Sequence, residues 1–137
     1  MAFKQSVLIL TTFPADGDAE KFAATLVDER FAACVNILPP MQSIYRWQGK
    51  VERANERQLL IKTSLGRWRA LEKRLKELHP YDVPEFLVVM IDKTATDYLS
   101  WLAENTKPLT PQEGSDPKSF SYETGKGSDP IAGWWPV

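Results

Sequence analysis

Apolar residues recur along this chain with two different periods, and the alternation between them predicts the order of its elements. A short, nearly continuous apolar run over residues 6–12 is typical of a strand buried on both faces. Turn residues interrupt this run, and apolar side chains then recur at helical spacing from Phe22 to Phe31. Either Asp16 or Asp18 can cap the start of this predicted helix.

Two further strands are predicted around a tight turn in the middle of the chain. Residues 33–38 are apolar and end at two prolines, and the chain then alternates apolar and polar residues from Ser43. Residues 48–50 read Gln-Gly-Lys, a turn, and residues 51–63 continue as a second strand. The distal half of this hairpin is too polar for a closed core, so we expect it to project or to pack on another subunit.

A second amphipathic helix and a last strand follow. Residues 65–78 place apolar side chains on one helical face, and Ser64 can cap its start. This helix must end before Pro80, because the residue that precedes a proline is forced out of the helical conformation. Pro84 then leads into an apolar strand over residues 85–92.

The predicted order is β-α-β-β-α-β, followed by a short helix that Thr94 or Thr96 can cap. This order predicts an α+β, ferredoxin-like fold, in which a four-stranded antiparallel sheet carries both main helices on one face. Something else must then cover the opposite face of the sheet.

The last part of the chain has a different composition. Residues 107–137 hold five of the ten prolines and four of the seven glycines, and they show no helical or strand period. We therefore predict a folded domain over residues 1–106 and an irregular extension over residues 107–137. Aromatic residues such as Trp134 and Trp135 indicate that parts of the extension dock on protein.

The charge of the chain excludes some partners. The net charge is −1, so no basic excess is present to bind nucleic acid by releasing counterions. The first residues contain only a short apolar run, too short to span a membrane, and no cleavage signal follows it. A single cysteine, Cys34, cannot form an intrachain disulfide and suits a reducing compartment. We expect a cytoplasmic protein that binds neither nucleic acid nor membrane.

The residues show no pattern of an enzyme. His79 is the only histidine, and none of the common metalloprotease, redox or phosphate-binding motifs occurs. Cys34 has no basic neighbour in sequence to activate it, so we interpret it as a small buried apolar residue. We therefore predict that the protein is not an enzyme.

Four segments together resemble one family. They are RFAACVNILPPMQSIYRWQGKVE (residues 30–52), LLIKT (59–63), LHPYDVPEF (78–86) and DYLSWL (97–102). They resemble the CutA family of divalent-cation-tolerance proteins, in register from Ser6 to about Asn105. The resemblance implies a ferredoxin-like subunit in a homotrimer similar to that of the PII signalling proteins, with the sheets packed inward. It also implies binding of divalent metal ions, copper first, in metal tolerance or homeostasis.

The resemblance also implies a set of metal ligands, which this chain matches only in part. Where copper binding is proposed in the family, the ligands are a cysteine on the first strand and a histidine pair before the Pro-Tyr dipeptide. Here the cysteine position is Thr11, and the histidine pair falls on Leu78 and His79. An imidazole suits Cu(II) or another divalent cation, and Glu85 can add an oxygen ligand. Alternatively, His79 only caps the end of its helix and packs beside Tyr81.

Two other functions remain open. Lys62, Tyr81, Trp47 and Tyr98 lie within or beside the family segments, and with Glu85 they suggest a cleft between subunits that binds a small ligand, as in PII-like sensors. The aromatic residues are equally typical of a core and a subunit interface. The third possibility is a structural trimeric scaffold whose extension or hairpin docks a partner.

Overall fold

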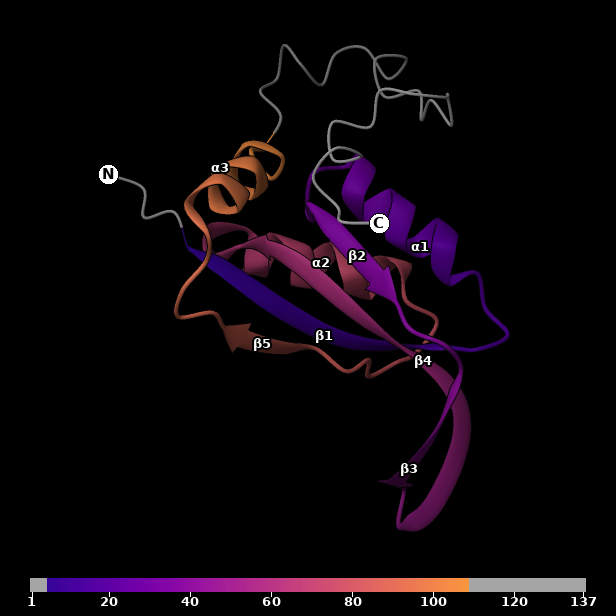
Figure 1. Ribbon diagram of the computed structural model, residues 1–137. Helices are drawn as coiled ribbons and strands as arrows, with labels where there is room; N and C mark the ends of the chain where they lie inside the picture. The colour runs from indigo at the N-terminus through magenta and orange to yellow at the C-terminus, as the bar shows by residue number, and fades with distance from the viewer. Residues whose placement is uncertain (1–4, 109–137) are drawn as a thin grey trace.

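The computed structural model describes residues 5–108 and confirms the predicted order of elements (Figure 1). The elements, in chain order, are β1 (Ser6–Pro14), α1 (Ala19–Asp28), β2 (Cys34–Ile37), β3 (Met41–Trp47), β4 (Lys50–Ser64), α2 (Trp68–Leu78), β5 (Leu87–Met90) and α3 (Thr96–Glu104). The strands run in the order β2-β4-β1-β5, all pairs antiparallel, and β3 pairs with the first half of β4. This is the ferredoxin-like arrangement.

The strand expected before the hairpin is divided in two. β2 ends at Ile37 and β3 begins at Met41, with Pro39 and Pro40 between them. Proline has no N–H to donate to a neighbouring strand, so pairing stops there and resumes after it. β2 and β3 consequently pair with separate halves of the long strand β4.

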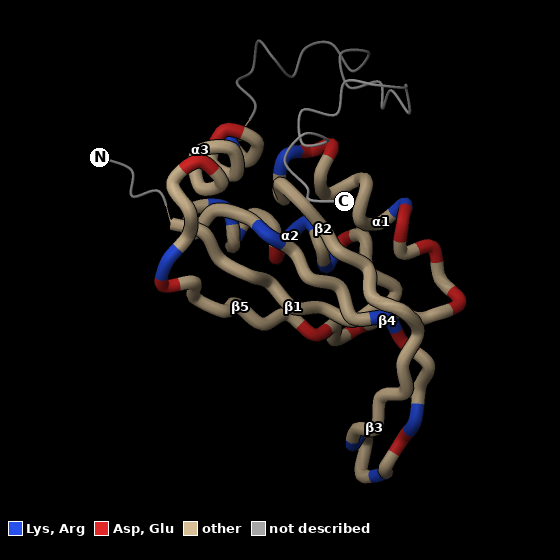
Figure 2. The backbone as a smooth tube through the Cα atoms, viewed as in Figure 1, with Lys and Arg blue, Asp and Glu red and all other residues tan. Residues whose placement is uncertain are grey.

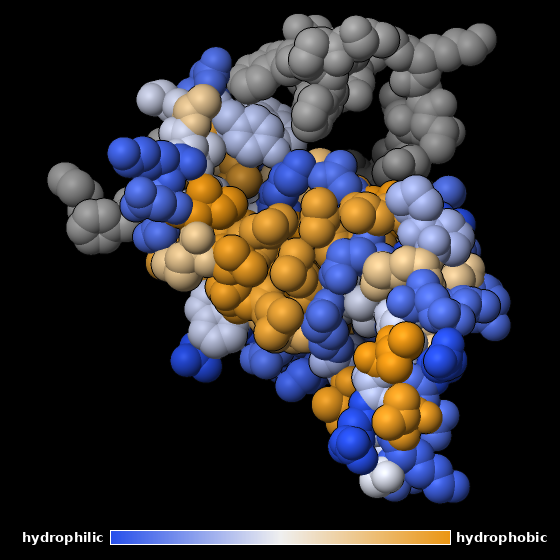
Figure 3. Space-filling view, turned by 60° about the horizontal axis from the view of Figure 1, so that its bottom comes forward, coloured by the Kyte–Doolittle hydropathy of each residue, from blue (hydrophilic) through white to orange (hydrophobic). Residues whose placement is uncertain are grey.

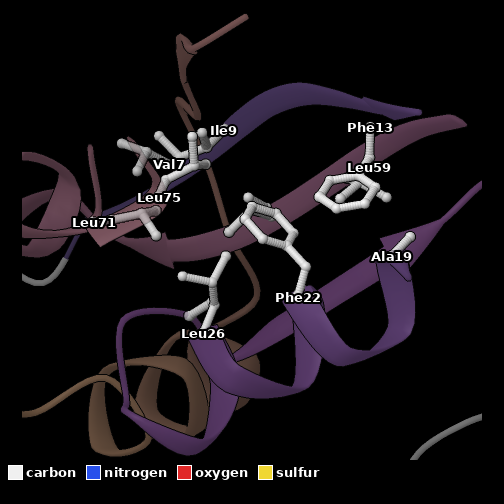
Figure 4. Packing of buried hydrophobic residues seen from close by; sticks show 11 residues of the cluster. Val7, Ile9, Phe13, Ala19, Phe22, Leu26, Leu59, Leu71 and Leu75 are labelled. Atoms are coloured by element: carbon white, nitrogen blue, oxygen red, sulfur yellow. The ribbon is translucent and has the colours of Figure 1, made fainter. Parts of the chain in front are cut away.

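The core lies between one face of the sheet and the two main helices. Side chains from β1 and β4 pack against α1 and α2, as Figure 4 shows for Ile9, Leu59, Phe22 and Leu75. Val7 and Ile9 are fully buried, whereas Leu8 and Leu10 alternate onto the other face and are only half-buried. The expectation that this strand is buried on both faces is therefore not met within a single chain.

The face of the sheet opposite the helices is apolar and uncovered. We call it the open face, and its apolar side chains are Leu8, Leu10, Leu60, Leu87 and Val89, which the strand register places side by side. Leu87 is 51% exposed and Val89 is 41% exposed. Figure 3 shows a continuous apolar surface here, and in Figure 2 β1 and β5 carry no charged residue. As predicted, the face of the sheet opposite the helices is left uncovered within a single subunit.

The hairpin of β3 and the first half of β4 extends away from the sheet, as expected (Figure 1). Its turn has two central residues, Gln48 and Gly49, with positive φ values of 49° and 80°. Such turns match the twist of the strands they join. Ile44 and Val51 on this arm are 60% and 65% exposed.

Helix ends follow the sequence only in part. Asp18 caps α1, accepting a hydrogen bond of 2.9 Å from the backbone N–H of Lys21. Ser64 makes no capping bond, and a short 3-10 turn (Leu65–Arg67) precedes α2. The hydroxyl of Ser64 is hydrogen-bonded to that of Thr106 instead.

The short helix α3 is attached to the end of the sheet. Neither predicted threonine caps it, because the N-cap residue is Ala95, and the Thr94 hydroxyl is hydrogen-bonded to that of Ser6 at 2.6 Å. Arg30 donates to the carbonyl oxygens of Glu104 and Lys107 at 2.6 and 2.8 Å. These contacts bind the last described residues to the start of β1 and the end of α1.

The proposed division between residues 106 and 107 stays a prediction. Almost all of the predicted extension, including Trp134 and Trp135, lies outside the described residues. Within residues 5–108, no helix is both long enough and apolar enough to cross a membrane.

Candidate functional site

A cavity of about 740 Å³ lies at the root of the hairpin, next to the segment that joins α2 to β5. We call it the root pocket. Its aromatic wall comprises Tyr45, Trp47 and Tyr81, and its acidic groups are Glu56, Asp82 and Glu85. Thr12 and Gln58, which are paired across β1 and β4, also line it, so the root pocket adjoins the open face.

The segment 80–86 forms one wall because of its two prolines. α2 ends at Leu78, and His79 already has an extended backbone, with φ −81° and ψ 139°. β5 pairs with β1 only from Val7 to Leu10, so the end of β1 is left for this segment to cover. Gln58 connects the two, since its amide donates to the carbonyl oxygen of Thr11 at 2.8 Å and to the carboxylate of Glu85 at 3.0 Å.

His79 is a buried histidine with both ring nitrogens occupied. Its Nε2 lies 2.7 Å from the carbonyl oxygen of Thr12, and its Nδ1 lies 3.1 Å from the backbone N–H of Tyr81. A carbonyl oxygen only accepts and an N–H only donates, so Nε2 carries the proton and Nδ1 is the acceptor. The ring also packs against Phe13, Phe22 and Tyr81, with centroid distances of 5.2, 5.6 and 4.8 Å.

This environment keeps His79 neutral. Burial lowers the pKa of the imidazole below its ordinary value, and the Thr12 carbonyl and the Glu56 carboxylate offset only part of that effect. The backbone N–H of His79 bonds to Leu75 at 2.8 Å and closes the last turn of α2. Of the two roles predicted for His79, the described contacts match the helix end packed beside Tyr81.

Glu56 is the most buried acidic residue of the root pocket. Its side chain is on β4 and the residue is 6% exposed. One carboxylate oxygen accepts a hydrogen bond of 2.7 Å from the hydroxyl of Tyr81. Burial, followed by the bond to Glu56, raises the pKa of Tyr81, so its hydroxyl remains a neutral donor at physiological pH.

Comparison with known proteins gives a consistent result. The family model described as CutA1 divalent ion tolerance protein matches residues 7–105. The chain belongs to the CutA family.

The match to CutA relatives spans nearly the full length of each relative. The divalent-cation tolerance protein CutA of Thermus thermophilus is 48% identical over 99 residues, which are 72% of this chain and 96% of the relative. That of Pyrococcus horikoshii is 44% identical over 101 residues, 74% of this chain and 98% of the relative. These relatives confirm the family that the sequence segments indicated.

The fold agrees with solved CutA structures. A CutA structure from Xylella fastidiosa has a TM-score of 0.72 and 43% identity, covering 75% of this chain and 99% of that one. A structure from Archaeoglobus fulgidus, named a periplasmic divalent cation tolerance protein, has a TM-score of 0.71 and 30% identity, covering 74% and 99%. One solved relative is therefore named for a compartment other than the cytoplasm.

The predicted metal ligands do not form a ready site within one CutA subunit. Thr11 is fully buried on the core face, and its hydroxyl has no hydrogen-bond partner among residues 5–108. The nitrogens of His79 are both occupied, and Glu85 is held by Gln58. In the described part of the chain, no three His, Cys, Asp or Glu side chains are grouped closely enough to hold a metal ion. The side chains present therefore do not fit a complete metal centre in a single chain.

The predicted cleft residues fall into two groups in this CutA subunit. Trp47, Tyr81 and Glu85 line the root pocket, whereas Lys62 and Tyr98 do not. Lys62 pairs with Cys34 near the other end of the sheet. There Tyr98 packs against Trp101, with ring centroids 5.4 Å apart. Burial and then Cys34 raise the pKa of Tyr98. Cys34 itself is half-exposed, so the expected full burial of this thiol is not seen within one chain.

Glu56 belongs to the site but was not predicted from the sequence, and the same is true of Gln58 and Asp82. Glu56 lies in a polar stretch of β4 that we expected to project, and its hydrogen-bond partner Tyr81 is 25 residues later in the chain. The only local signal is its strand phase, which places it on the same face as Gln58 and Leu60.

Proposed function

We propose that this protein acts in tolerance of divalent cations as a cytoplasmic homotrimer that binds Cu(II) or another divalent cation. Membership of the CutA family supports the link to divalent cations. The assembly and the metal are separate parts of the proposal, and each rests on its own observation.

The open face supports the homotrimer. It presents leucine and valine side chains, including Leu87 at 51% exposure, beside a hairpin arm with further exposed apolar residues. Contiguous apolar surface of this kind is rare on proteins that remain monomeric. Its burial contributes roughly 25 cal/mol per Å² of apolar area, and therefore stabilises an assembly that packs sheet against sheet.

Glu85 and His79 are the proposed ligands of the metal. For His79 to bind through Nδ1, the ring must give up the backbone N–H of Tyr81, and the segment 80–86 must then shift. Glu85 must similarly leave Gln58. We therefore expect binding that is weaker than at a preformed site with three ligands, with copper preferred by its place in the divalent affinity order.

Calorimetric titration of Cu(II) into the full chain tests this assignment. We expect Glu85→Gln and His79→Gln each to weaken binding by roughly tenfold or more. Glu104→Gln is the control, because Glu104 is on α3, outside the root pocket, and its side chain pairs with Lys107. Equal Cu(II) binding in all four proteins would show that these residues are not the ligands, and no heat in any of them would remove the metal from the proposal.

The root pocket favours a second candidate function, the binding of a small ligand as in PII-like sensors. Its volume of about 740 Å³ falls within the range typical of small-molecule sites. In a cleft between subunits, Trp47 and Tyr81 would come from one subunit and Lys62 and Tyr98 from another, because they lie apart within one chain. A thermal-shift panel of metabolites tests this, since a ligand that binds only the folded state raises the melting temperature.

A further inference from the structure

The charged groups that line the root pocket all have the same sign. Glu56, Asp82 and Glu85 contribute carboxylates, and no lysine, arginine or histidine is among the lining residues. The whole chain has a net charge of only −1, so this concentration of negative charge is local. A cavity with such a lining repels anions and attracts cations.

Glu56 is the carboxylate in the root pocket at which a bound cation would be most strongly stabilised. It is 6% exposed, and among the described residues its side chain has no basic partner. The Tyr81 hydroxyl bonds to Oε2, while Oε1 has no hydrogen-bond partner in the described part of the chain. Oε1 is not among the buried polar atoms that lack a partner, so it is accessible from the cavity that Glu56 lines, and a cation there can form a charge-assisted hydrogen bond with it.

The remaining wall is aromatic and apolar. Tyr45, Trp47 and Tyr81 line the same cavity, with Ile44 and Val83 beside them. Aromatic rings attract organic cations through their faces and pack against the apolar parts of such ligands. Among the described residues no three His, Cys, Asp or Glu side chains are grouped closely enough to hold a bare metal ion, so the lining suits an organic cation better.

We propose that the root pocket binds a small organic cation, an alkylammonium or alkylguanidinium with an apolar stem. This inference rests on the second candidate function, ligand binding in the root pocket, and specifies the chemical class of the ligand. The charged head lies at Oε1 of Glu56, and the stem lies along Tyr45 and Trp47. The proposed ligand is a free molecule, for which the cavity of about 740 Å³ has room, and a side chain of a neighbouring copy is the alternative that the test must exclude.

Calorimetry with butylguanidinium chloride and with butylurea tests the class of ligand. The two probes have nearly the same shape, and only the first is charged. We expect the full chain, in its native assembly, to bind butylguanidinium and not butylurea. Equal affinity for both probes, or no binding of butylguanidinium, would overturn the proposal.

Glu56→Gln tests the proposed contact. The substitution removes the charge, nearly conserves volume and leaves an amide oxygen to accept from Tyr81. We expect it to weaken binding of butylguanidinium by roughly tenfold to hundredfold, the usual range for a charged hydrogen bond. Glu104→Gln, which lies outside the root pocket, should bind as the unsubstituted protein does. Unchanged binding in Glu56→Gln would contradict the assignment.

Further measurements distinguish a wrong ligand class from a pocket that a neighbouring copy fills and from a pocket that binds no ligand. A variant with Arg46, Lys50 and Arg53 all changed to glutamine removes the three cations of the hairpin arm, which a neighbouring copy could insert. Binding that appears only in this variant would show that a neighbour's side chain fills the root pocket, and the free ligand would be ruled out. Pentanoate is an anion with an apolar stem of similar length. If it binds and butylguanidinium does not, the root pocket still binds small ligands, but their proposed chemical class is wrong. If neither probe nor any metabolite binds, both are wrong.

Discussion

At the scale of single residues, the neutral state of His79 has a consequence for stability. Burial lowers the pKa of His79 in the folded protein below its ordinary value of 6.5. The unfolded chain therefore takes up a proton more readily than the folded one. The contribution of neutral His79 to the free energy of unfolding is fully present above pH 6.5. It is lost as the pH falls through 6.5 towards the lowered pKa of the folded protein.

His79→Gln should separate this effect from all other titrations. Glutamine can still donate to the Thr12 carbonyl but does not titrate, so the variant lacks the histidine-dependent loss at low pH. Melting temperatures of both proteins, measured from about pH 8 down to about pH 5, should converge as the pH falls. A difference that stays constant over this range would mean that the folded protein does not disfavour the charged imidazole.

Thr11 offers a second test, because its fully buried hydroxyl lacks a partner among the described residues. Thr11→Val replaces that hydroxyl by a methyl group of similar size. We expect the free energy of unfolding to rise by about 1 kcal/mol, as measured by urea denaturation, since an unsatisfied polar group is removed from the core.

Thr63 provides the matched control for Thr11. It is equally buried on the core face of β4, but its hydroxyl donates to the carbonyl oxygen of Phe31 at 2.7 Å. Thr63→Val should therefore lower the free energy of unfolding by about 1 kcal/mol. A fall of similar size in both variants would show that the hydroxyl of Thr11 is satisfied after all.

At the scale of elements, the turn of the β3–β4 hairpin depends on Gly49. Its φ is +80°, and a Cβ added there would meet no atom within 4 Å, so the cost of alanine comes from the backbone alone. Gly49→Ala should destabilise the hairpin by about 1–2 kcal/mol. Hydrogen exchange of the backbone amides in β3, followed by NMR, measures the local stability of the hairpin.

Gly66 is the control for Gly49. It lies in the 3-10 turn before α2, a Cβ there also meets no atom within 4 Å, and its φ is not in the left-handed region. Gly66→Ala should be neutral or stabilising by up to about 1 kcal/mol, because alanine restricts the unfolded chain. If both substitutions destabilised equally, backbone conformation would not be the cause at Gly49.

Elements set by local chemistry could be read from the sequence, and those set by distant partners could not. Asp18 caps α1 and the two prolines divide β2 from β3, both through neighbours in the chain. Ser64 looked like a cap, yet it bonds to Thr106, 42 residues away. The same limit applies to the site, since the motif that holds Tyr81 and Glu85 was visible whereas Glu56 becomes part of the site only after folding.

At the scale of the whole molecule, the open face and the root pocket adjoin each other through Thr12 and Gln58. Packing of sheets against the open face therefore brings a neighbouring subunit close to the acidic pocket. Assembly and ligand binding are consequently coupled in this proposal, and a ligand that bridges two subunits stabilises the trimer by mass action.

Leu87→Glu tests the assembly directly. Leu87 is 51% exposed in the single subunit, so a charged side chain there can remain solvated and need not disturb the core. In a trimer that buries the open face, the same charge would have to be desolvated without a partner, at a cost of several kcal/mol for each copy. By sedimentation equilibrium, we expect Leu87→Glu to be a folded monomer and the unsubstituted protein to be a trimer.

Lys73→Glu controls for the added charge. Lys73 is exposed on α2, and α2 covers the face of the sheet opposite the open face. This variant changes the charge by two units instead of one, yet it should remain a trimer, because surface charges far from the interface contribute little. If Leu87→Glu also stayed trimeric with unchanged stability, the open face could not be the surface on which the subunits pack, and another cover for it would have to be sought.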